Sequence, residues 1–409
     1  MDHSSRSNIT RLAVGRLISV AGGAAAYTAL MYTVWNQTHS ALLQSGTLLL
    51  TFGVVGILAP VTGHLGDRFD RRKVMIWAEL IAAAFFAVMA FVDRPLVLVP
   101  LAFFSAIAEA PFYSASTAAI PALAENEEEI AHANSLLGIG RNAGIMVGPA
   151  VGGLLIAHIG PDWVFGLNAV TFLISVLITV SVRGNYAQDR TQAEEDEHRG
   201  MSAGIRFIWH ERVLRRMTLA WLVFLLGAGI GMVADAPLAD FFHAGPTGFG
   251  WLITVWGGGS VLGSLLGRKL TRRTEPMWLV LGAGGIALGH LGVGLAPVFW
   301  VVLVFGLFMG TSDGLTIVAE TGIMQRRTPD AVRSRVMAGF DAALSLGLAV
   351  AYIFAAPVLK LVGPQKAYLL GGIAAAIATF MLLPLWRLGR EADTLPEPER
   401  PISPVTDTG

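Results

Sequence analysis

The chain has 409 residues, of which 54% are hydrophobic and only 14% are charged, and its mean hydropathy is +0.61. A soluble domain needs roughly 25% charged residues to cover its surface, so this composition predicts a membrane protein rather than two or three soluble domains. The 29 basic and 29 acidic residues balance, which argues against a nucleic-acid partner, and the absence of cysteine excludes disulfides, thiol catalysis and thiolate metal sites.

Apolar segments recur along the chain, separated by short polar breaks. The first, at about residues 12–35, is long enough for a membrane helix, which takes ~20 residues, and it lacks the short apolar core and cleavage site of a signal peptide. Such runs predict helices, because a barrel strand crosses with ~10 alternating residues. We expect twelve membrane helices, at about residues 12–35, 41–62, 74–92, 96–118, 134–157, 162–182, 216–239, 248–267, 277–295, 298–322, 335–359 and 366–386.

A polar interruption divides the chain nearly in half. Its later part places Ile205, Ile208 and Trp209 on one helical side, which predicts an amphipathic helix at the membrane surface. We therefore expect an all-α membrane protein with two pseudo-symmetric six-helix bundles, at residues 1–182 and 216–387. A cytoplasmic segment at 183–215 joins them, and a Pro-rich, disordered cytoplasmic tail follows at 388–409.

The basic residues predict the orientation. Lys and Arg gather in the leader, the central segment, the tail and alternate loops, whereas only Arg94, Lys360 and Lys366 fall in the opposite loops. Basic residues concentrate on the cytoplasmic side of membrane proteins. We therefore expect a multi-pass protein of the cell membrane, with both termini in the cytoplasm.

The segment after the second span is repeated after the eighth, 200 residues later. Gly63 and Arg68 of the first copy correspond to Gly263 and Arg268 of the second. A parallel repeat of this kind, about an axis along the membrane normal, is one way in which secondary transporters are built.

The first copy resembles the loop motif of the major facilitator superfamily, in which a glycine, three residues and Asp-Arg precede a basic cluster. The resemblance implies the twelve-helix fold of that family and a gate in which Asp67 meets the start of the eleventh helix. A carboxylate can accept hydrogen bonds from the free N–H groups there, but the loop can also be a positive-inside anchor alone. Asp70 stands where the family usually has glycine. The matching residues are Gly63, Asp67, Arg68, Arg71 and Arg72.

Glycines in the fifth span resemble a Gly-Pro-x-x-Gly-Gly motif of drug/proton antiporters in that superfamily, although Ser135 replaces the first glycine of the extended motif. These residues allow small side chains to pack tightly against a neighbouring helix. They also allow the two bundles to rotate against each other along this helix, and the two roles are compatible. The stretch Gln325–Arg335 also resembles a loop of macrolide-efflux and siderophore-exporter-like members. The motif residues are Gly144, Gly148, Pro149, Gly152 and Gly153.

Ionisable residues inside the predicted spans are the sharpest functional signal, because each costs ~2.5–3.5 kcal/mol at the membrane centre on insertion scales. Glu79, Glu320 and Arg16 lie near a predicted cytoplasmic boundary, where we expect them to reach water. Glu109 and Asp313 lie deep, 204 residues apart, and so at equivalent places in the repeat. The candidates for proton coupling are Glu109, Asp313, Asp235 and Asp341, and the alternative for each is a structural bond between helices.

The resemblance implies that helices 1, 4, 7 and 10 line a central cavity. A period of 3.6 residues places polar and aromatic residues on the same helix faces as Glu109 and Asp313. The cavity candidates are Tyr27, Ser105, Phe112, Tyr113, Ser116 and Thr316.

These features favour a proton-coupled exporter of amphipathic small molecules, a drug or a secreted metabolite. The alternative is a proton-coupled symporter or facilitator that imports a small nutrient. A receptor or scaffold would leave the paired deep carboxyls unexplained, and an enzyme is disfavoured because no nucleophile–base pair is visible. His and carboxylate residues lack metal-site spacing, and a phosphate-binding loop is absent. We expect no cofactor or metal, a monomer, and as partners a small-molecule substrate, protons and the lipid bilayer.

Overall fold

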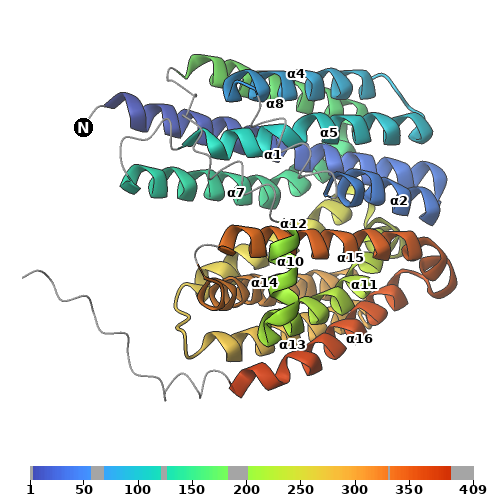
Figure 1. Cartoon of the computed structure of the whole chain (residues 1–409). Helices are drawn as coiled ribbons and strands as arrows, with labels where there is room; N and C mark the ends of the chain where they lie inside the picture. The colour runs from blue at the N-terminus through green and yellow to red at the C-terminus, as the bar shows by residue number, and fades with distance from the viewer. Residues whose placement is uncertain (1–2, 57–68, 121–126, 183–200, 330–331, 388–409) are drawn as a thin grey trace, which may run out of the picture.

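The computed structural model describes residues 3–56, 69–120, 127–182, 201–329 and 332–387 (Figure 1). These residues form helices joined by short turns, and no strand occurs among them. The helices are α1 (His3–Thr38), α2 (Ala41–Leu48), the π-helix η1 (Leu49–Val54), α4 (Arg71–Met89), α5 (Pro95–Ala118), α7 (Glu127–Ile159), α8 (Pro161–Ser181), α10 (Met201–His210), α11 (Arg212–Phe241), α12 (Gly245–Gly267), α13 (Glu275–Gly294), α14 (Phe299–Arg327), α15 (Arg333–Val362), α16 (Pro364–Leu382) and the 3₁₀ helix η3 (Leu383–Arg387).

Each predicted span overlaps the observed helices, and the end of the second span, residues 57–62, lies outside the described residues. Among the described residues, nine helices are long and apolar enough to cross a membrane. The other three spans correspond to α2 with η1, to α4, which carries Glu79 among its apolar residues, and to α7, whose apolar part is Ala143–Ile159. The helices α1 and α7 begin earlier than predicted, because a helix can continue into water beyond the apolar segment that hydropathy detects.

The helices pack in two groups that repeat the same pairings. The amino-terminal group comprises α1 to α8 and the carboxy-terminal group α10 to η3, and Figure 1 shows them above and below one another. The pairs α1–α7, α1–α8, α4–α5 and α4–α8 recur as α11–α15, α11–α16, α13–α14 and α13–α16. This repetition is the pseudo-symmetry that the sequence repeat predicts.

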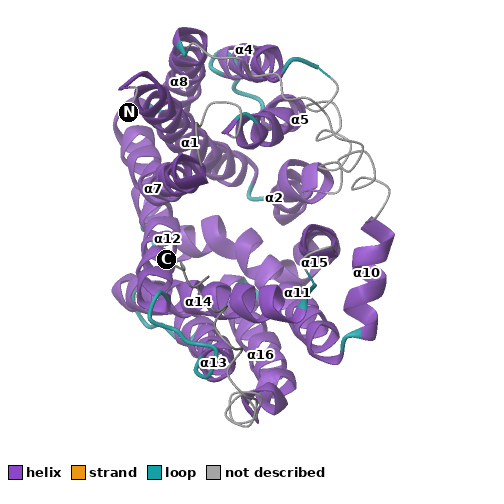
Figure 2. Cartoon of the chain, turned by 60° about the vertical axis from the view of Figure 1, so that its left-hand side comes forward, coloured by secondary structure: helices purple, strands orange, loops and turns teal. Residues whose placement is uncertain are grey.

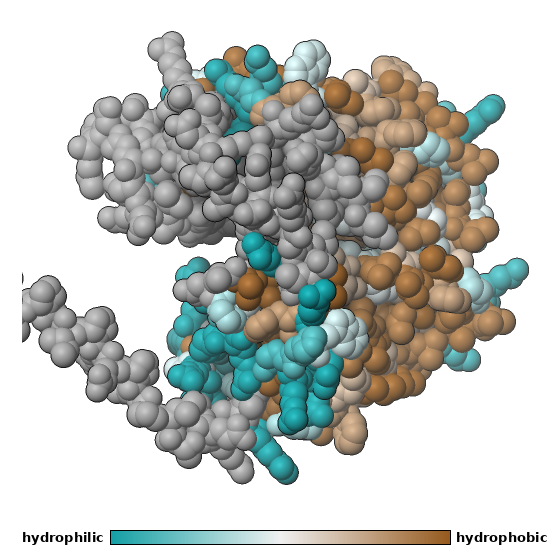
Figure 3. All heavy atoms as spheres, viewed as in Figure 1, coloured by the Kyte–Doolittle hydropathy of each residue, from teal (hydrophilic) through white to brown (hydrophobic). Residues whose placement is uncertain are grey.

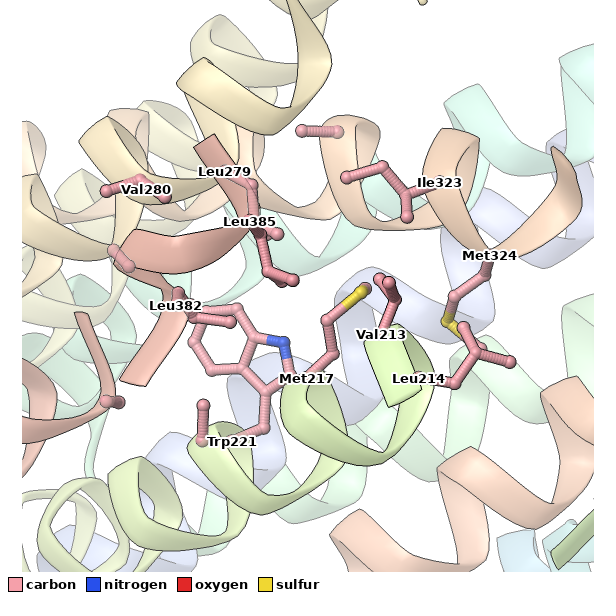
Figure 4. Packing of buried hydrophobic residues seen from close by; sticks show 14 of the residues in the cluster. Val213, Leu214, Met217, Trp221, Leu279, Val280, Ile323, Met324, Leu382 and Leu385 are labelled. Atoms are coloured by element: carbon pink, nitrogen blue, oxygen red, sulfur yellow. The ribbon is translucent and has the colours of Figure 1, made fainter. Parts of the chain in front are cut away.

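We call the end of the molecule at which α1 and α11 begin the proximal end, and the opposite end the distal end. A buried cluster at the proximal end, including Met217, Ile323 and Leu382, comes from the carboxy-terminal group alone (Figure 4). A distal cluster instead joins Met31 and Leu48 of the amino-terminal group to α11–α16. The two groups therefore share a core toward the distal end.

Large apolar side chains cover much of the described surface on the face shown in Figure 3. Trp77, Phe91, Trp163, Trp300 and Phe380 each leave more than half of their area exposed. An exposed apolar surface of this extent is unfavourable in water and favours contact with lipid.

The predicted amphipathic helix is α10, which stands beside α15 in Figure 2. Its Ile208 is buried in the proximal cluster, whereas Ile205 and Trp209 remain partly exposed. Gly204 lies directly on the backbone of Arg335 at the start of α15. Part of the predicted apolar face of α10 therefore packs against other helices of the protein.

Candidate functional site in the membrane helices

The glycine motif of α7 has two faces that contact different groups of helices. Gly144, Gly148 and Gly152 follow one another at four-residue spacing and lie against the backbone of α1. Gly153 instead faces α12 of the other group, where a β-carbon on it would lie 2.6 Å from the Pro246 carbonyl oxygen. The motif therefore combines tight packing inside one group with close approach between the groups.

The contact between α7 and α12 is made by backbone atoms. A β-carbon on Gly250 would meet the Pro149 carbonyl oxygen, and the Thr247 hydroxyl lies 3.5 Å from the Gly153 carbonyl oxygen. Closer to mid-depth, Gly258 meets only the side chain of Met146. Figure 2 shows the two helices side by side.

A second seam joins the groups where α2 and η1 cross α15. Gly53 lies against Ala349, and Gly56 lies against Ser345. The Ser45 hydroxyl donates to the backbone carbonyl of Tyr352. The two seams therefore hold the groups together from the distal end to mid-depth.

Polar contacts close the distal end between α1 and α11. The Trp35 indole N–H donates to an Asp240 carboxylate oxygen at 3.2 Å, and His39 Nε2 lies 3.8 Å from the same oxygen. A hollow of about 770 Å³, lined partly by Trp35, Asp240 and Lys360, opens beside this contact.

Glu109 belongs to a charged cluster inside the amino-terminal group. It is half-buried on α5, and its charge interacts with those of Arg16 on α1 and Glu79 on α4. The Arg16 guanidinium donates to the Ser116 hydroxyl at 3.0 Å. The expectation that Arg16 and Glu79 reach water is wrong, since Arg16 is 6% exposed and Glu79 is fully buried.

The acidic residues of the carboxy-terminal group are spread along α14 and α15. Asp313 is half-buried and faces the Ser260 hydroxyl of α12, while Glu320 faces the Trp221 indole of α11. Asp341 is exposed on α15 and interacts with Glu320. Glu109 and Asp313 thus occupy equivalent helices but have different neighbours.

Asp235 lies in the distal half, in a separate cluster with tyrosines. The Tyr368 hydroxyl of α16 donates to its carboxylate, and Tyr352 and Tyr27 are also close enough to interact with it. The ring of His290 on α13 lies 5.8 Å from that of Tyr368. These residues come from α1, α11, α13, α15 and α16, and no spacing within the chain signals that they meet.

The cavity candidates fall into different surroundings. Ser105 is buried, Phe112 packs against Met75 of α4, and the Thr316 hydroxyl donates to the Ser312 carbonyl beside Gly282 of α13. Tyr27 is half-buried with its ring edge on Phe52. The side chain of Tyr113 lies outside the part of the chain that is described. Their role in substrate binding stays a prediction.

Only the end of the loop motif is described, because Gly63, Asp67 and Arg68 lie outside the described residues. Asp70 accepts a hydrogen bond from the Lys73 backbone N–H at 3.0 Å and so caps the start of α4. Arg72 donates to the Val180 carbonyl at the end of α8, where the partial negative charge of a helix end favours a cation. Arg71 lies half-buried beside it.

The described residues contain no group of three or more His, Asp or Glu side chains that could hold a metal ion.

The Major Facilitator Superfamily model matches residues 12–241 and 222–406. The chain belongs to the major facilitator superfamily. It is therefore a multi-pass membrane transporter of small molecules and not an enzyme. The fold expected from the loop motif is confirmed.

Relatives within the superfamily include exporters. The chain is 27% identical over 421 residues to the multidrug efflux pump Tap of Mycolicibacterium fortuitum, which covers 97% of each chain. It is 24% identical over 329 residues to the enterobactin exporter EntS of Shigella boydii, covering 79% of this chain and 78% of that one. An uncharacterized transporter of the superfamily, YfiS of Bacillus subtilis, is 27% identical over 82% of this chain and 83% of its own. The resemblance to the drug and siderophore exporter group is thus confirmed.

Solved superfamily structures share the fold at low sequence identity. A bacterial homologue of the human lysosomal transporter Spinster, in an inward-facing and unoccupied conformation, has a TM-score of 0.75 at 13% identity, covering 96% of this chain and 98% of that one. The nucleoside transporter NupG has a TM-score of 0.71 at 12% identity, covering 93% and 99%.

Proposed function

We propose that this protein exports amphipathic small molecules in exchange for protons. The observation that carries the proposal is the pair Glu109 and Asp313, two half-buried carboxyls on the equivalent helices α5 and α14. Carboxyls inside a membrane protein are costly and mark ion or substrate pathways. A low-dielectric site favours their neutral form, so each is suited to bind and release a proton as water access changes.

The direction of transport is supported by the relatives, since two of them are named as an efflux pump and an exporter. The charges inside the helices support the substrate class. Among the described residues there, the carboxyls Glu79, Glu109, Asp235, Asp313 and Glu320 outnumber buried cations such as Arg16, which disfavours a polyanionic substrate. The alternative function is import of a nutrient, with the same carboxyls binding the coupled protons, and the vesicle experiment below distinguishes the two.

The two seams support a conformational cycle of alternating access. We place the proximal end in the cytoplasm, because basic residues gather there, so contacts at the distal end close the outer side. The protein then works as a monomer that alternates between this state and one closed at the proximal end. In that second state Asp67 would cap the start of α15, the same turn on which Gly204 of α10 rests.

Inverted membrane vesicles with an imposed pH gradient test the exchange. With the interior acidic, we expect uptake of a lipophilic drug panel and release of protons from the vesicles as substrate enters. A vesicle preparation lacking the protein is the control. Movement of substrate and protons in the same direction would contradict export by exchange and favour a symporter.

Cysteine labelling tests the orientation, and the natural absence of cysteine makes each site unambiguous. Single cysteines near Gln37 or Gly245 should react with an impermeant maleimide added to intact cells. Cysteines near Asp70 or Asp330 should react only after permeabilisation. The reversed pattern would refute the placement of the termini in the cytoplasm.

A further inference from the structure

Glu79 is a carboxyl enclosed within the amino-terminal group. It lies on α4, where α5 and α8 pack, and is 0% exposed. The polar groups that face it are the hydroxyls of Ser19 on α1 and Ser175 on α8. Neither of its carboxylate oxygens makes a hydrogen bond of ordinary geometry to the described residues.

An ionised carboxylate in this position would be very unfavourable. Burying a charge without a partner costs several kcal/mol even after relaxation, and such a group neutralises instead. Among the described side chains, the charged group that faces Glu79 is Glu109 of α5, which is repulsive, while α8 contributes the uncharged Ser175. The cation of the cluster, Arg16 of α1, interacts with Glu109.

We propose that Glu79 is a proton-binding site enclosed by α1, α4, α5 and α8, and that it exchanges its proton with Glu109. In this transfer the O–H bond of the Glu109 carboxyl breaks and an O–H bond forms on Glu79. Glu109 is left as a carboxylate beside Arg16, which stabilises it. The pair then holds one proton between two sites, with the negative charge at the site that has a cation.

The surroundings of the pair supply groups that can assist this transfer. Glu109 is half-buried, so it is the member of the pair that can meet water. A mainly apolar hollow of about 10 Å³ has Arg16, Ser116 and Ser175 among its lining residues, and its volume is close to the space that one water molecule needs. The hydroxyls of Ser19 and Ser175 can each accept a proton from one side and donate one on the other.

The role of Glu79 in transport rests on the proposed proton exchange, but its protonation can be measured without transport. The purified full-length protein in lipid is examined by infrared difference spectroscopy near neutral pH. Protonated carboxyls have a C=O band distinct from that of carboxylates, and the band shifts when the proton is replaced by deuterium. We expect the wild type to show this band and Glu79→Gln to lose one component of it.

Two further variants keep the result interpretable. Asp93→Asn removes an exposed carboxyl in the turn between α4 and α5 and should leave the band unchanged. Glu109→Gln should retain the Glu79 component but slow its shift in D₂O, because the exchange partner is gone. If Glu79→Gln does not fold, this slowing still tests the assignment.

The outcomes separate the two proposals. An unchanged band in Glu79→Gln, or the same deuterium exchange in Glu109→Gln as in the wild type, would overturn the proton site. Loss of the wild-type band on adding sodium would also overturn it, in favour of a cation site. If substrate moves no protons in vesicles but the band behaves as expected, the exchange proposal fails and the proton site stands.

Discussion

Glu109→Gln should reduce transport driven by a pH gradient to the background of empty vesicles. Glutamine reproduces the shape and hydrogen bonding of the protonated carboxyl but cannot release a proton. Substrate should still bind. In the wild type, affinity should fall as the pH falls, because protonation and substrate compete, and linkage makes each weaken the other. In the variant, affinity should be independent of pH in the range where Glu109 titrates.

Asp313→Asn is the matched comparison, since it changes the equivalent carboxyl in the other group. It should show the same loss more weakly, or lose substrate affinity if Asp313 serves recognition. Binding measured by tryptophan fluorescence across a pH series distinguishes the two cases. Wild-type transport in both variants would show that the coupling carboxyl lies elsewhere, with Asp235 and Asp341 next to be tested.

Gly153→Ala should shift the protein toward a state that is open at the distal end and abolish alternation. The added β-carbon would lie 2.6 Å from the Pro246 carbonyl oxygen and 3.1 Å from Gly250 Cα. Both obstacles are backbone atoms, which cannot rotate away as a side chain can. Spin labels at Leu42 and Leu361, two exposed distal residues of opposite groups, should report a longer distance by electron paramagnetic resonance.

Gly258→Ala provides the control on the same pair of helices. Its β-carbon would meet only the side chain of Met146, at an ordinary 3.7 Å, so the label distance and transport should match those of the wild type. An unchanged distance in Gly153→Ala would mean that the seam can yield without separating the groups.

The sequence specifies the helices far better than it specifies which way they face. Hydropathy locates the spans because the membrane demands about 20 apolar residues for each. Inside a membrane protein, however, the lipid-facing and core-facing sides are both apolar, so rotation about a helix axis leaves little trace in the pattern. Depth alone suggested that Glu79 reaches water, but packing against α5 and α8 encloses it.

The glycine motif of α7 shows what a local pattern can and cannot establish. Its residue types predicted close approach, and the four-residue spacing of Gly144, Gly148 and Gly152 explains the stripe against α1. That Gly153 faces another helix almost one hundred residues away depends on how the two groups meet, which is a tertiary property. The tyrosines around Asp235 were likewise invisible to motif reasoning.

The seam between α7 and α12 has a consequence for how such transporters diverge. The close contact is formed by main-chain oxygens and α-carbons of Pro149, Gly153, Pro246 and Gly250. It therefore requires small or cyclic residues at these four positions. Side chains on α5 and α14 can then be replaced by selection without altering the surface on which the halves close. We therefore expect the chemistry of the cargo and the mechanics of the cycle to depend on separate sets of residues.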